Sequence, residues 1–331
     1  MTTKQSFCSV LAPIAIDYLA HARALGRAYA TEEHVLRYLD TFLAHVHSDL
    51  TSESFALWCH TGNHLSSGVQ RNRMRIVRNL CLYRRRTDPT CFLPDLSQFP
   101  APHQVIRPHI FTDTEILAVL AAAEGLTSNG GSPLHREVFR LAIVLLYTTG
   151  LRRGELLRLT VGDYEPYEHT LVVRESKFHK SRLLPLSSDG YHELDAYLQA
   201  RRARELPTSP ETPLLWNRNR GGNGYTGTGI WMGIRALFRT AGIRTAAGRL
   251  PRVHDLRHNF GVQALLRWYR AGVDVQAKLP FLAAYMGHVS VISTEYYLHF
   301  IEEIAACASE RFAKHCGGLI VGHCGDAGGA S

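Results

Sequence analysis

The sequence predicts a mainly helical α+β protein with two domains and one small antiparallel sheet. Helical apolar spacing runs through residues 8–88, and a proline-rich stretch follows at 89–110. The second half contains one pair of strand-like runs, TLVVRESKFHKSRLLPL at 170–186, among further helical patterns. With 331 residues, 45% apolar and 20% charged, the chain is long enough and apolar enough to bury two cores.

The first segment, residues 8–88, shows helical periodicity. Thr31 is placed to cap a helix whose first turn contains Glu32 and Glu33, where the helix dipole favours acids. One face of this helix is apolar and comprises Val35, Leu39, Phe42, Leu43 and Val46. We therefore expect a helical N-terminal domain.

A second helix is predicted over 71–86, RNRMRIVRNLCLYRRR. Its apolar side comprises Met74, Val77 and Cys81, together with Ile76 and Leu80. The stretch holds seven arginines and no acid. An ordinary solvated face is the alternative interpretation, but such a face usually mixes signs, and arginine binds phosphate with two parallel hydrogen bonds. The pattern favours nucleic-acid contact through four arginines that lie near one another on a stripe: Arg71, Arg75, Arg78 and Arg85.

Five prolines between 89 and 110 predict a linker with little regular structure. A new helix is indicated directly afterwards, because Thr112 and Glu115 form a capping box and Phe111 and Ile116 can form its hydrophobic staple. We expect a helical domain over 1–105 that ends in this linker, a second domain over 111–315, and a glycine-rich tail over 316–331.

The elements of the second domain follow in order. An apolar helix at about 135–148 stops at Gly150, and Arg152 and Arg153 then open a short helix. The two runs within 170–186 read as strands around a polar turn, and helices resume from Arg252.

Composition restricts the setting and the partners. The net charge is +8 and the pI is near 9.2, which is compatible with a polyanionic partner but weak evidence alone. Seven cysteines without CxxC spacing predict a reducing compartment. The apolar run after Lys4 is interrupted by Asp17, and LAIVLLYTTGL is too short to span a bilayer. We expect a soluble cytoplasmic protein with no membrane partner.

Four short stretches carry residues suited to chemistry on a phosphate. They are TTGLRRGELLRL, SKFHKSR, HDLRH and GHVSVISTEYYLH, which begin at 148, 176, 254 and 287. Converging arginine, lysine and histidine side chains would bind a phosphate and its developing charge without the acid clusters that hold Mg²⁺. A tyrosine could serve as nucleophile once cations lower its pKa or a base takes its proton. Each stretch alone has a structural explanation, whereas the ordered set is hard to attribute to chance.

The order of these residues resembles the tyrosine recombinase, or phage integrase, family. The matching pieces are GLR ending at Arg152, a hairpin lysine at Lys177, and HxxR at His254 and Arg257. GH ending at His288 follows, and Tyr297 comes nine residues later. The resemblance covers about 111–315, and LPFLAAYMGH is also similar to recombinases carried in groups by transposable elements. It implies the family's two-domain architecture, with a helical core-binding domain ahead of a mixed catalytic domain.

The resemblance also implies a mechanism. Tyr297 would attack the scissile phosphodiester and form a 3′-phosphotyrosyl link, while Arg152, Arg257 and His288 bind the non-bridging oxygens. Lys177 would protonate the leaving 5′-oxygen, His254 would help to accept the tyrosine proton, and Glu155 would orient the arginines. Neither metal, cofactor nor ATP would be required. Arg153, Lys180 and Tyr296 are the neighbouring alternatives. The family phase favours Arg152 and Tyr297, and Lys177 is favoured because KxxKxR places it at the start of the turn, next to the first strand.

The expected partner is double-stranded DNA with specific recombination sites. We expect Lys180 and Arg182, beside the hairpin turn, to contact DNA together with the four arginines of 71–86. A homotetramer on DNA, possible sister recombinases and association with the nucleoid follow from the family resemblance. Type IB topoisomerase-like relaxation and a catalytically silent DNA-binding protein are the alternative functions.

Overall fold

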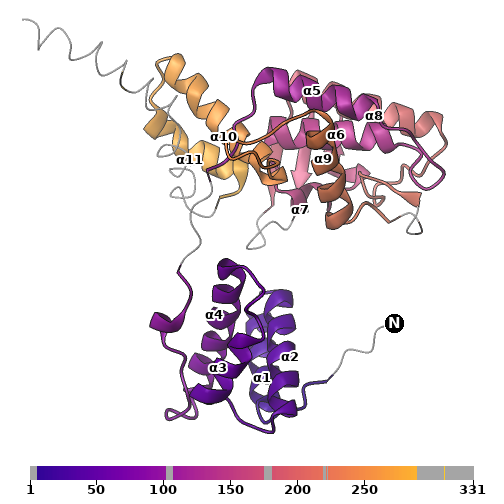
Figure 1. Cartoon of the computed structure of the whole chain (residues 1–331). Coiled ribbons are helices and arrows are strands. Elements are labelled where there is room, and N and C mark those ends of the chain that lie inside the picture. The colour runs from indigo at the N-terminus through magenta and orange to yellow at the C-terminus, as the bar shows by residue number, and fades with distance from the viewer. Residues whose placement is uncertain are drawn as a thin grey trace, which may run out of the picture. The chain divides into compact units, whose positions relative to one another are not determined.

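A computed structural model describes residues 6–101, 107–174, 181–218, 221, 223–288 and 309 of the chain. The chain forms two compact units, Met1–Ile106 and Arg107–Ser331. The described part is mainly helical with one small antiparallel sheet, as the sequence predicts, and a third strand joins the predicted pair. Each unit has its own buried core. Figure 1 labels the helices that make up each unit.

The first unit is a bundle of four helices. They are α1 (Ala12–Ala24), α2 (Ala30–His45), α3 (Ser52–His60) and α4 (Ser67–Arg84). Their apolar faces meet around Trp58 and Val77, which are 1% and 0% exposed. The apolar side predicted for 71–86 is buried in this core, with Met74, Ile76, Val77, Leu80 and Cys81 inward. After α4, the proline-rich segment contains only a short 3-10 helix, η1 (Leu96–Gln98), within its described residues.

The predicted cap of α2 is wrong. The helix begins at Ala30, so Thr31 lies inside its first turn, behind a Tyr29 that has a left-handed backbone with φ 48°. The reason is tertiary packing, because the ring of Tyr29 packs edge-on against Tyr18 with centroids 5.7 Å apart. That aromatic contact fixes the entry into the helix in place of a hydroxyl cap.

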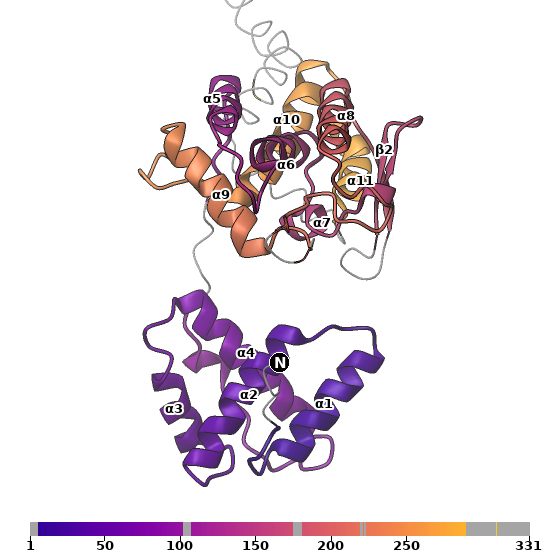
Figure 2. The same ribbon diagram turned by 90° about the vertical axis from the view of Figure 1, so that its right-hand side faces the viewer.

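In the second unit, a central helix is enclosed by its neighbours. The centre is α6 (His135–Thr149), whose buried side chains include Leu141, Ala142 and Ile143 at 0% exposure. Figure 2 shows α6 nearly end-on among four surrounding helices: α5 (Asp113–Glu124), α8 (Ser188–Ala203), α9 (Gly227–Thr240) and α10 (Val253–Arg270). The unit begins as the sequence predicts, since Thr112 and Glu115 form a capping box at α5.

The sheet lies beside this helical layer. Its strands β1 (Tyr164–Glu165), β2 (Thr170–Val173) and β3 (Arg182–Pro185) are antiparallel in the order β1-β2-β3. Val173 pairs with Arg182, which places both residues next to the hairpin turn. The predicted pair of strands is therefore confirmed, and the turn residues 175–180 lie outside the described ranges.

Three short pieces complete the unit around the candidate site. The helix α7 (Arg153–Leu156) follows α6, and η2 (Val161–Asp163) leads into the sheet. The helix α11 (Val275–Met286) packs on α10 and β3 and ends at Gly287, whose φ is 69°. Within the described ranges, no helix is both long and apolar enough to cross a bilayer.

Candidate active site

Arg152 and Glu155 are brought together by the short helix α7. Gly150 ends α6 in the left-handed region at φ 62°, which turns the chain sharply into Leu151 and Arg152. The backbone N–H of Arg152 donates to Oε2 of Glu155 at 2.9 Å, and its Nη1 donates to Oε1 at 2.7 Å. The three-residue spacing seen in the sequence therefore places one buried carboxylate, that of Glu155 at 2% exposed, against both the backbone and the guanidinium of Arg152.

Arg182 approaches the same carboxylate from strand β3. Its Nη1 and Nη2 donate to Oε1 and Oε2 of Glu155 at 3.2 and 2.9 Å. Its Nε donates to the backbone carbonyl of Tyr285, at the end of α11, at 2.8 Å. Glu155 is thus shared between two guanidinium groups that arrive from different elements.

These contacts keep Glu155 ionised. Burial alone would raise the pKa of Glu155, but the hydrogen bonds and charges of Arg182 and Arg152 outweigh it and hold that pKa at about 2. A buried carboxylate that is negative at neutral pH offsets part of the positive charge gathered here.

Arg257 is the most deeply buried of the site arginines. It lies in the first turn of α10, and the residue is 2% exposed. Its Nη1 donates to the carbonyl of Gly150 at 2.5 Å and its Nη2 to the carbonyl of Met286 at 2.7 Å. The side chain therefore joins the end of α6 to the end of α11.

The last turn of α11 collects all three arginines. The carbonyls of Tyr285, Met286 and Gly287 accept from Arg182, Arg257 and Arg152 respectively, the last at 2.6 Å. The final carbonyls of a helix have no partner inside the helix, and cations are favoured at that end of its dipole. The end of α11 is thus a scaffold that gathers positive charge next to His288.

Both the backbone conformation at position 287 and the closeness of neighbouring side chains require glycine there. Its φ of 69° is one that side-chain-bearing residues rarely adopt. A Cβ atom there would lie 2.7 Å from Nη1 of Arg182 and 3.3 Å from Nη1 of Arg152. Only glycine lets these two guanidinium groups pack against the chain ahead of His288.

Three histidines border the arginines. His254 and His258 lie four residues apart on α10 with ring centroids 4.7 Å apart and planes at 87°, and His288 follows α11. Burial, reinforced by neighbouring cations, lowers the pKa of His288 to about 4 and that of His258 to about 3. Burial and Arg257 also lower the pKa of His254, although this residue keeps a solvent-exposed side. Neutral imidazoles can accept as well as donate protons at pH 7.

The sequence-predicted site residues divide into two groups. Five of them meet around the end of α11 and the start of α10: Arg152, Glu155, His254, Arg257 and His288. Lys177, Lys180, Tyr296 and Tyr297 lie outside the described residues. Arg182, expected to contact DNA, instead makes intramolecular hydrogen bonds and its side chain is only 12% exposed.

Sequence reasoning overlooked two contributors to this cluster. His258 stands one residue after the HxxR arginine, in HDLRH, and the four-residue spacing from His254 was the available signal. The structural part of Arg182 could not be read from its strand position, because its partners lie 27 and 103 residues away. In the part of the chain that the structure describes, no group of three or more His, Cys, Asp or Glu side chains could hold a metal ion.

The predicted DNA-contact arginines of the first unit differ in their surroundings. Arg71, Arg78 and Arg85 donate to the carbonyls of Pro100, Pro94 and Cys91 respectively, and so fasten the proline-rich segment to α4. Arg75 is exposed, and its Nη2 donates to Oδ1 of the nearby Asn72 at 2.9 Å. Arg75 is therefore the member of the four with the freest access to a ligand.

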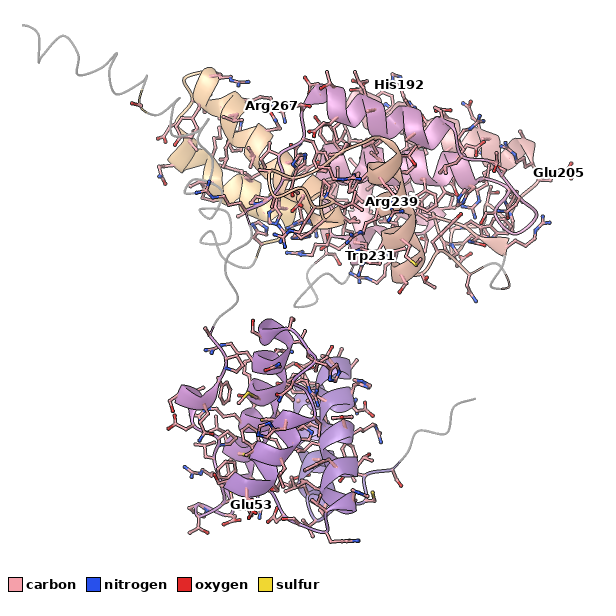
Figure 3. The ribbon with its side chains drawn as sticks, in the orientation of Figure 1. Glu53, His192, Glu205, Trp231, Arg239 and Arg267 are labelled. Carbon is pink, nitrogen blue, oxygen red and sulfur yellow. The ribbon has the colours of Figure 1, made fainter. Side chains whose placement is uncertain are left out.

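A further cationic stripe lies on α9. Arg235 stacks over the ring of Trp231 at 4.9 Å, and Arg239 follows one turn later. Trp231 and Arg239 are exposed, and Figure 3 labels both on this helix. The buried side of α9 is apolar, with Ile230, Ile234, Leu237 and Phe238, so packing aims the stripe outward.

Comparisons with known proteins identify the family of this chain. The model of the phage integrase family matches residues 111–303. Over 301 residues the chain is 29% identical to y4rB of Sinorhizobium fredii, which is named provisionally as an integrase/recombinase; the match covers 90% of this chain and 95% of that protein. It is 31% identical over 216 residues to the tyrosine recombinase XerD of Mycobacterium tuberculosis, covering 64% of each.

Solved structures share the fold. The Tn1549 transposon integrase in complex with transposon right end DNA has a TM-score of 0.62 at 18% identity, covering 91% of this chain and 99% of that one. The XerH site-specific recombinase in a post-cleavage complex has a TM-score of 0.60 at 19% identity, covering 86% and 78%. The family model spans more than half of the sequence, and it includes every residue of the arginine and histidine cluster. This chain therefore belongs to the phage integrase family of tyrosine recombinases, whose members are enzymes that cut and rejoin DNA.

Proposed function

We propose that this protein is a site-specific DNA recombinase that acts through a 3′-phosphotyrosyl intermediate and serves the integration, excision or transposition of a mobile element. The observation that carries this proposal is the gathering of Arg152, Arg257 and His288 at the end of α11. The sequence reaches Tyr297 nine residues after His288. One stretch of chain thus carries both His288, where the two arginines meet, and the proposed nucleophile.

The proposed reaction is a transesterification. The phenolic oxygen of Tyr297 attacks the phosphorus and forms a P–O bond, while the bond from phosphorus to the 5′-oxygen breaks. His254 takes the phenolic proton, and Lys177 gives a proton to the leaving oxygen. Arg152 and Arg257 stabilise the charge on the non-bridging oxygens, with His288 as a further donor.

The reverse step rejoins DNA. A 5′-hydroxyl from a second duplex attacks the phosphotyrosyl phosphorus, and Tyr297 leaves with its proton restored. The phosphodiester energy is kept in the covalent link, so no nucleotide hydrolysis is needed. When the attacking strand comes from a different duplex, the result is strand exchange.

The proposed DNA partner is contacted by both units. In the first unit we assign this contact chiefly to Arg75, with Arg71, Arg78 and Arg85 also supporting the segment that follows α4. In the second unit Lys180, in the hairpin turn, and the α9 stripe of Trp231, Arg235 and Arg239 add contacts. Stacking on tryptophan and bidentate arginine contacts both suit nucleic acid. Four protomers on two DNA sites, alone or with sister recombinases, would complete the assembly.

The test is covalent capture. The full-length protein is incubated with a nicked duplex, taken from the DNA around its coding sequence that it protects in footprinting. The nick lets the downstream fragment diffuse away, so the phosphotyrosyl product accumulates and is seen as a protein–DNA band on a denaturing gel. We expect this band for wild type and Tyr296→Phe and its absence for Tyr297→Phe.

Other outcomes identify the alternatives. A band that persists in Tyr297→Phe overturns the nucleophile. Relaxation of any supercoiled plasmid, without a site requirement, indicates a type IB topoisomerase-like activity, and tight site binding without any band indicates a catalytically silent binding protein. A stable tetramer in light scattering without DNA contradicts assembly on the DNA sites.

A further inference from the structure

We propose that Arg182 is a positioning residue, which couples the β2–β3 hairpin to the end of α11 and fixes the orientation of Arg152 through their shared partner Glu155. This inference rests on the proposed function, because the hairpin turn carries Lys177 and the chain beyond α11 carries Tyr297. It assigns Arg182 a different part from the DNA contact expected from sequence.

The hydrogen bonding of Arg182 is directed inward. Both terminal nitrogens donate to the carboxylate of Glu155, and Nε donates to the carbonyl of Tyr285 at 2.8 Å. The side chain is 12% exposed, whereas that of Arg152 is 27% exposed. All three guanidinium nitrogens of Arg182 therefore donate to protein acceptors, two of them to a buried carboxylate, and these contacts are those of a residue that positions other groups.

A second contact fastens the same two elements. The hydroxyl of Tyr285 donates to the carbonyl of Pro185, at the far end of β3, at 3.0 Å. The ring of Tyr285 also stacks on Phe260 of α10, with centroids 5.4 Å apart. Strand β3 is therefore tied to α11 at two points, Arg182 and Pro185, and α11 is tied to α10. A shift of the hairpin along α11 would break these hydrogen bonds.

Glu155 transmits the effect to Arg152. It separates two guanidinium groups that would repel each other in this poorly solvated place. With both arginines present, Oε1 accepts from Arg152 at 2.7 Å and from Arg182 at 3.2 Å, and the other η-nitrogen of Arg152 donates to Gly287. Without Arg182, Arg152 would be the only arginine paired with the Glu155 carboxylate, and the undivided negative charge would attract Arg152 more strongly toward Glu155. Arg152 would then be less available to a phosphate.

The electrostatic surroundings of Glu155 make this testable by pH. The charged groups that face it are Arg152 at the start of α7 and Arg182 on β3, and a cavity of about 270 Å³ beside it is also lined by Arg158, Asp163 and Arg174. His288, after α11, lies near both Arg152 and Arg182. Among the groups that lower the pKa of Glu155, Arg182 has the largest effect, so its removal should raise that pKa.

The experiment compares Arg182→Gln with wild type in DNA binding and in covalent capture. We expect binding to the footprinted duplex within about twofold of wild type and the same slope of log affinity against log salt. Adduct formation at pH 7 should fall roughly 10- to 100-fold, as misplacement of a catalytic group does. The acid limb of the adduct-rate profile should move to higher pH, because Glu155 would become protonated more easily.

Two variants separate positioning from folding. Arg182→Lys keeps the charge near Glu155 and should restore part of the rate and most of the pH profile. Arg140→Gln removes an arginine that also pairs with glutamates, Glu124 and Glu193, but on the α5–α8 side of the unit. It measures the effect of breaking a partly exposed arginine–carboxylate network elsewhere, and we expect its pH profile to match wild type.

The opposing results are distinct. Arg182→Gln could instead show a slope of log affinity against log salt that is smaller by about one, with an unchanged pH profile. Arg182 would then be a phosphate contact, and the positioning assignment would be overturned. A wild-type rate in Arg182→Gln would also overturn it. Absence of an adduct in the wild-type protein itself would instead contradict the proposed function, so the two failures are read from different samples.

Discussion

The guanidinium of Arg257 donates to the carbonyl oxygen of Gly150, which lies 107 residues earlier in the chain, at 2.5 Å. This hydrogen bond joins the GLR turn to the HxxR helix, two of the sequence motifs that mark the family. Arg257 makes a second hydrogen bond, to the carbonyl oxygen of Met286 at 2.7 Å, and Met286 directly precedes the GH motif. One buried side chain thus assembles three motifs, and its removal should affect both fold and chemistry.

Arg257→Ala should destabilise the second unit and abolish adduct formation. Two buried carbonyls would lose a charged donor, which costs about 1.5 to 3 kcal/mol for each hydrogen bond. Urea unfolding measures the first effect and covalent capture the second. Arg257→Lys, which keeps the charge, should remain folded and bind DNA with little loss, because many phosphate contacts remain, yet form no adduct. Full activity in Arg257→Lys would show that two-pronged donation is unnecessary.

Gly287→Ala should impair cleavage more than its backbone strain explains. The left-handed φ alone costs about 1 to 2 kcal/mol for alanine. The new Cβ would also lie 2.7 Å from Arg182, which must move. Gly272→Ala is the matched control, since Gly272 has a φ of 70° and no atom of the described residues lies within 4 Å of the Cβ that alanine would add. Thermal melts should show similar strain in both, whereas adduct formation should fall only in Gly287→Ala.

Glu155→Gln should change the dependence of stability on pH. The folded-state pKa of Glu155 is about 2, below the ordinary 4.5, so the carboxylate stabilises the protein above pH 4.5 and loses this effect as pH falls toward 2. The contribution is about 3 kcal/mol above pH 5. Urea unfolding of wild type and Glu155→Gln should therefore show a stability difference that narrows between pH 5 and pH 3. A constant difference would mean that Glu155 is not ionised in the folded protein.

His258→Gln should flatten the stability profile on the acid side of neutrality. The folded-state pKa of His258 is about 3, below the ordinary 6.5, and its charged or titratable neighbours are His254, Arg252, Arg257 and His288. The unfolded chain then binds the proton first, so stability falls as pH drops from 7 to 5, by about 2 kcal/mol for this residue. The variant should lose less stability over that interval when unfolded by urea, and an identical slope would contradict the neutral state of His258.

Arg75→Ala and Arg78→Ala form a contrasting pair on α4. Arg75 is exposed, and its loss should reduce the slope of log affinity against log salt by about one ion with little change in unfolding free energy. Arg78 donates to the carbonyl of Pro94 at 2.5 Å, so its loss should destabilise the first unit in urea unfolding. If wild type and Arg75→Ala showed the same slope of log affinity against log salt, the assignment of a DNA contact to this surface would be wrong.

Local signals were enough to predict much of the fold. The capping box at Thr112 and Glu115 and the stop at Gly150 depend on neighbours in the chain, and both occur in the structure. The paired strands within 170–186 follow from two short apolar runs on either side of a polar turn, and they also occur. The cap at Thr31 failed because the distant ring of Tyr18 sets the position of Tyr29.

In the candidate site too, the features set by local sequence were predictable and those set by distant contacts were not. The residue types and order pointed to Arg152, Glu155, Arg257, His254 and His288, because phosphate chemistry restricts which side chains can serve. The carbonyl partners at the end of α11 could not be predicted, since any residue offers the same backbone oxygen. The role of Arg182 depends on a meeting of β3, α7 and α11 that no local pattern encodes.

The buried amide of Asn259 accepts the backbone N–H of Phe111 at 3.0 Å, across 148 residues. Asn259 is 0% exposed and Phe111 is 1% exposed. A fragment made to express the second unit alone should therefore start before Phe111. A fragment that started at Phe111 would place a free ammonium group in an apolar interior, whereas one that started a few residues earlier would keep an ordinary peptide bond there.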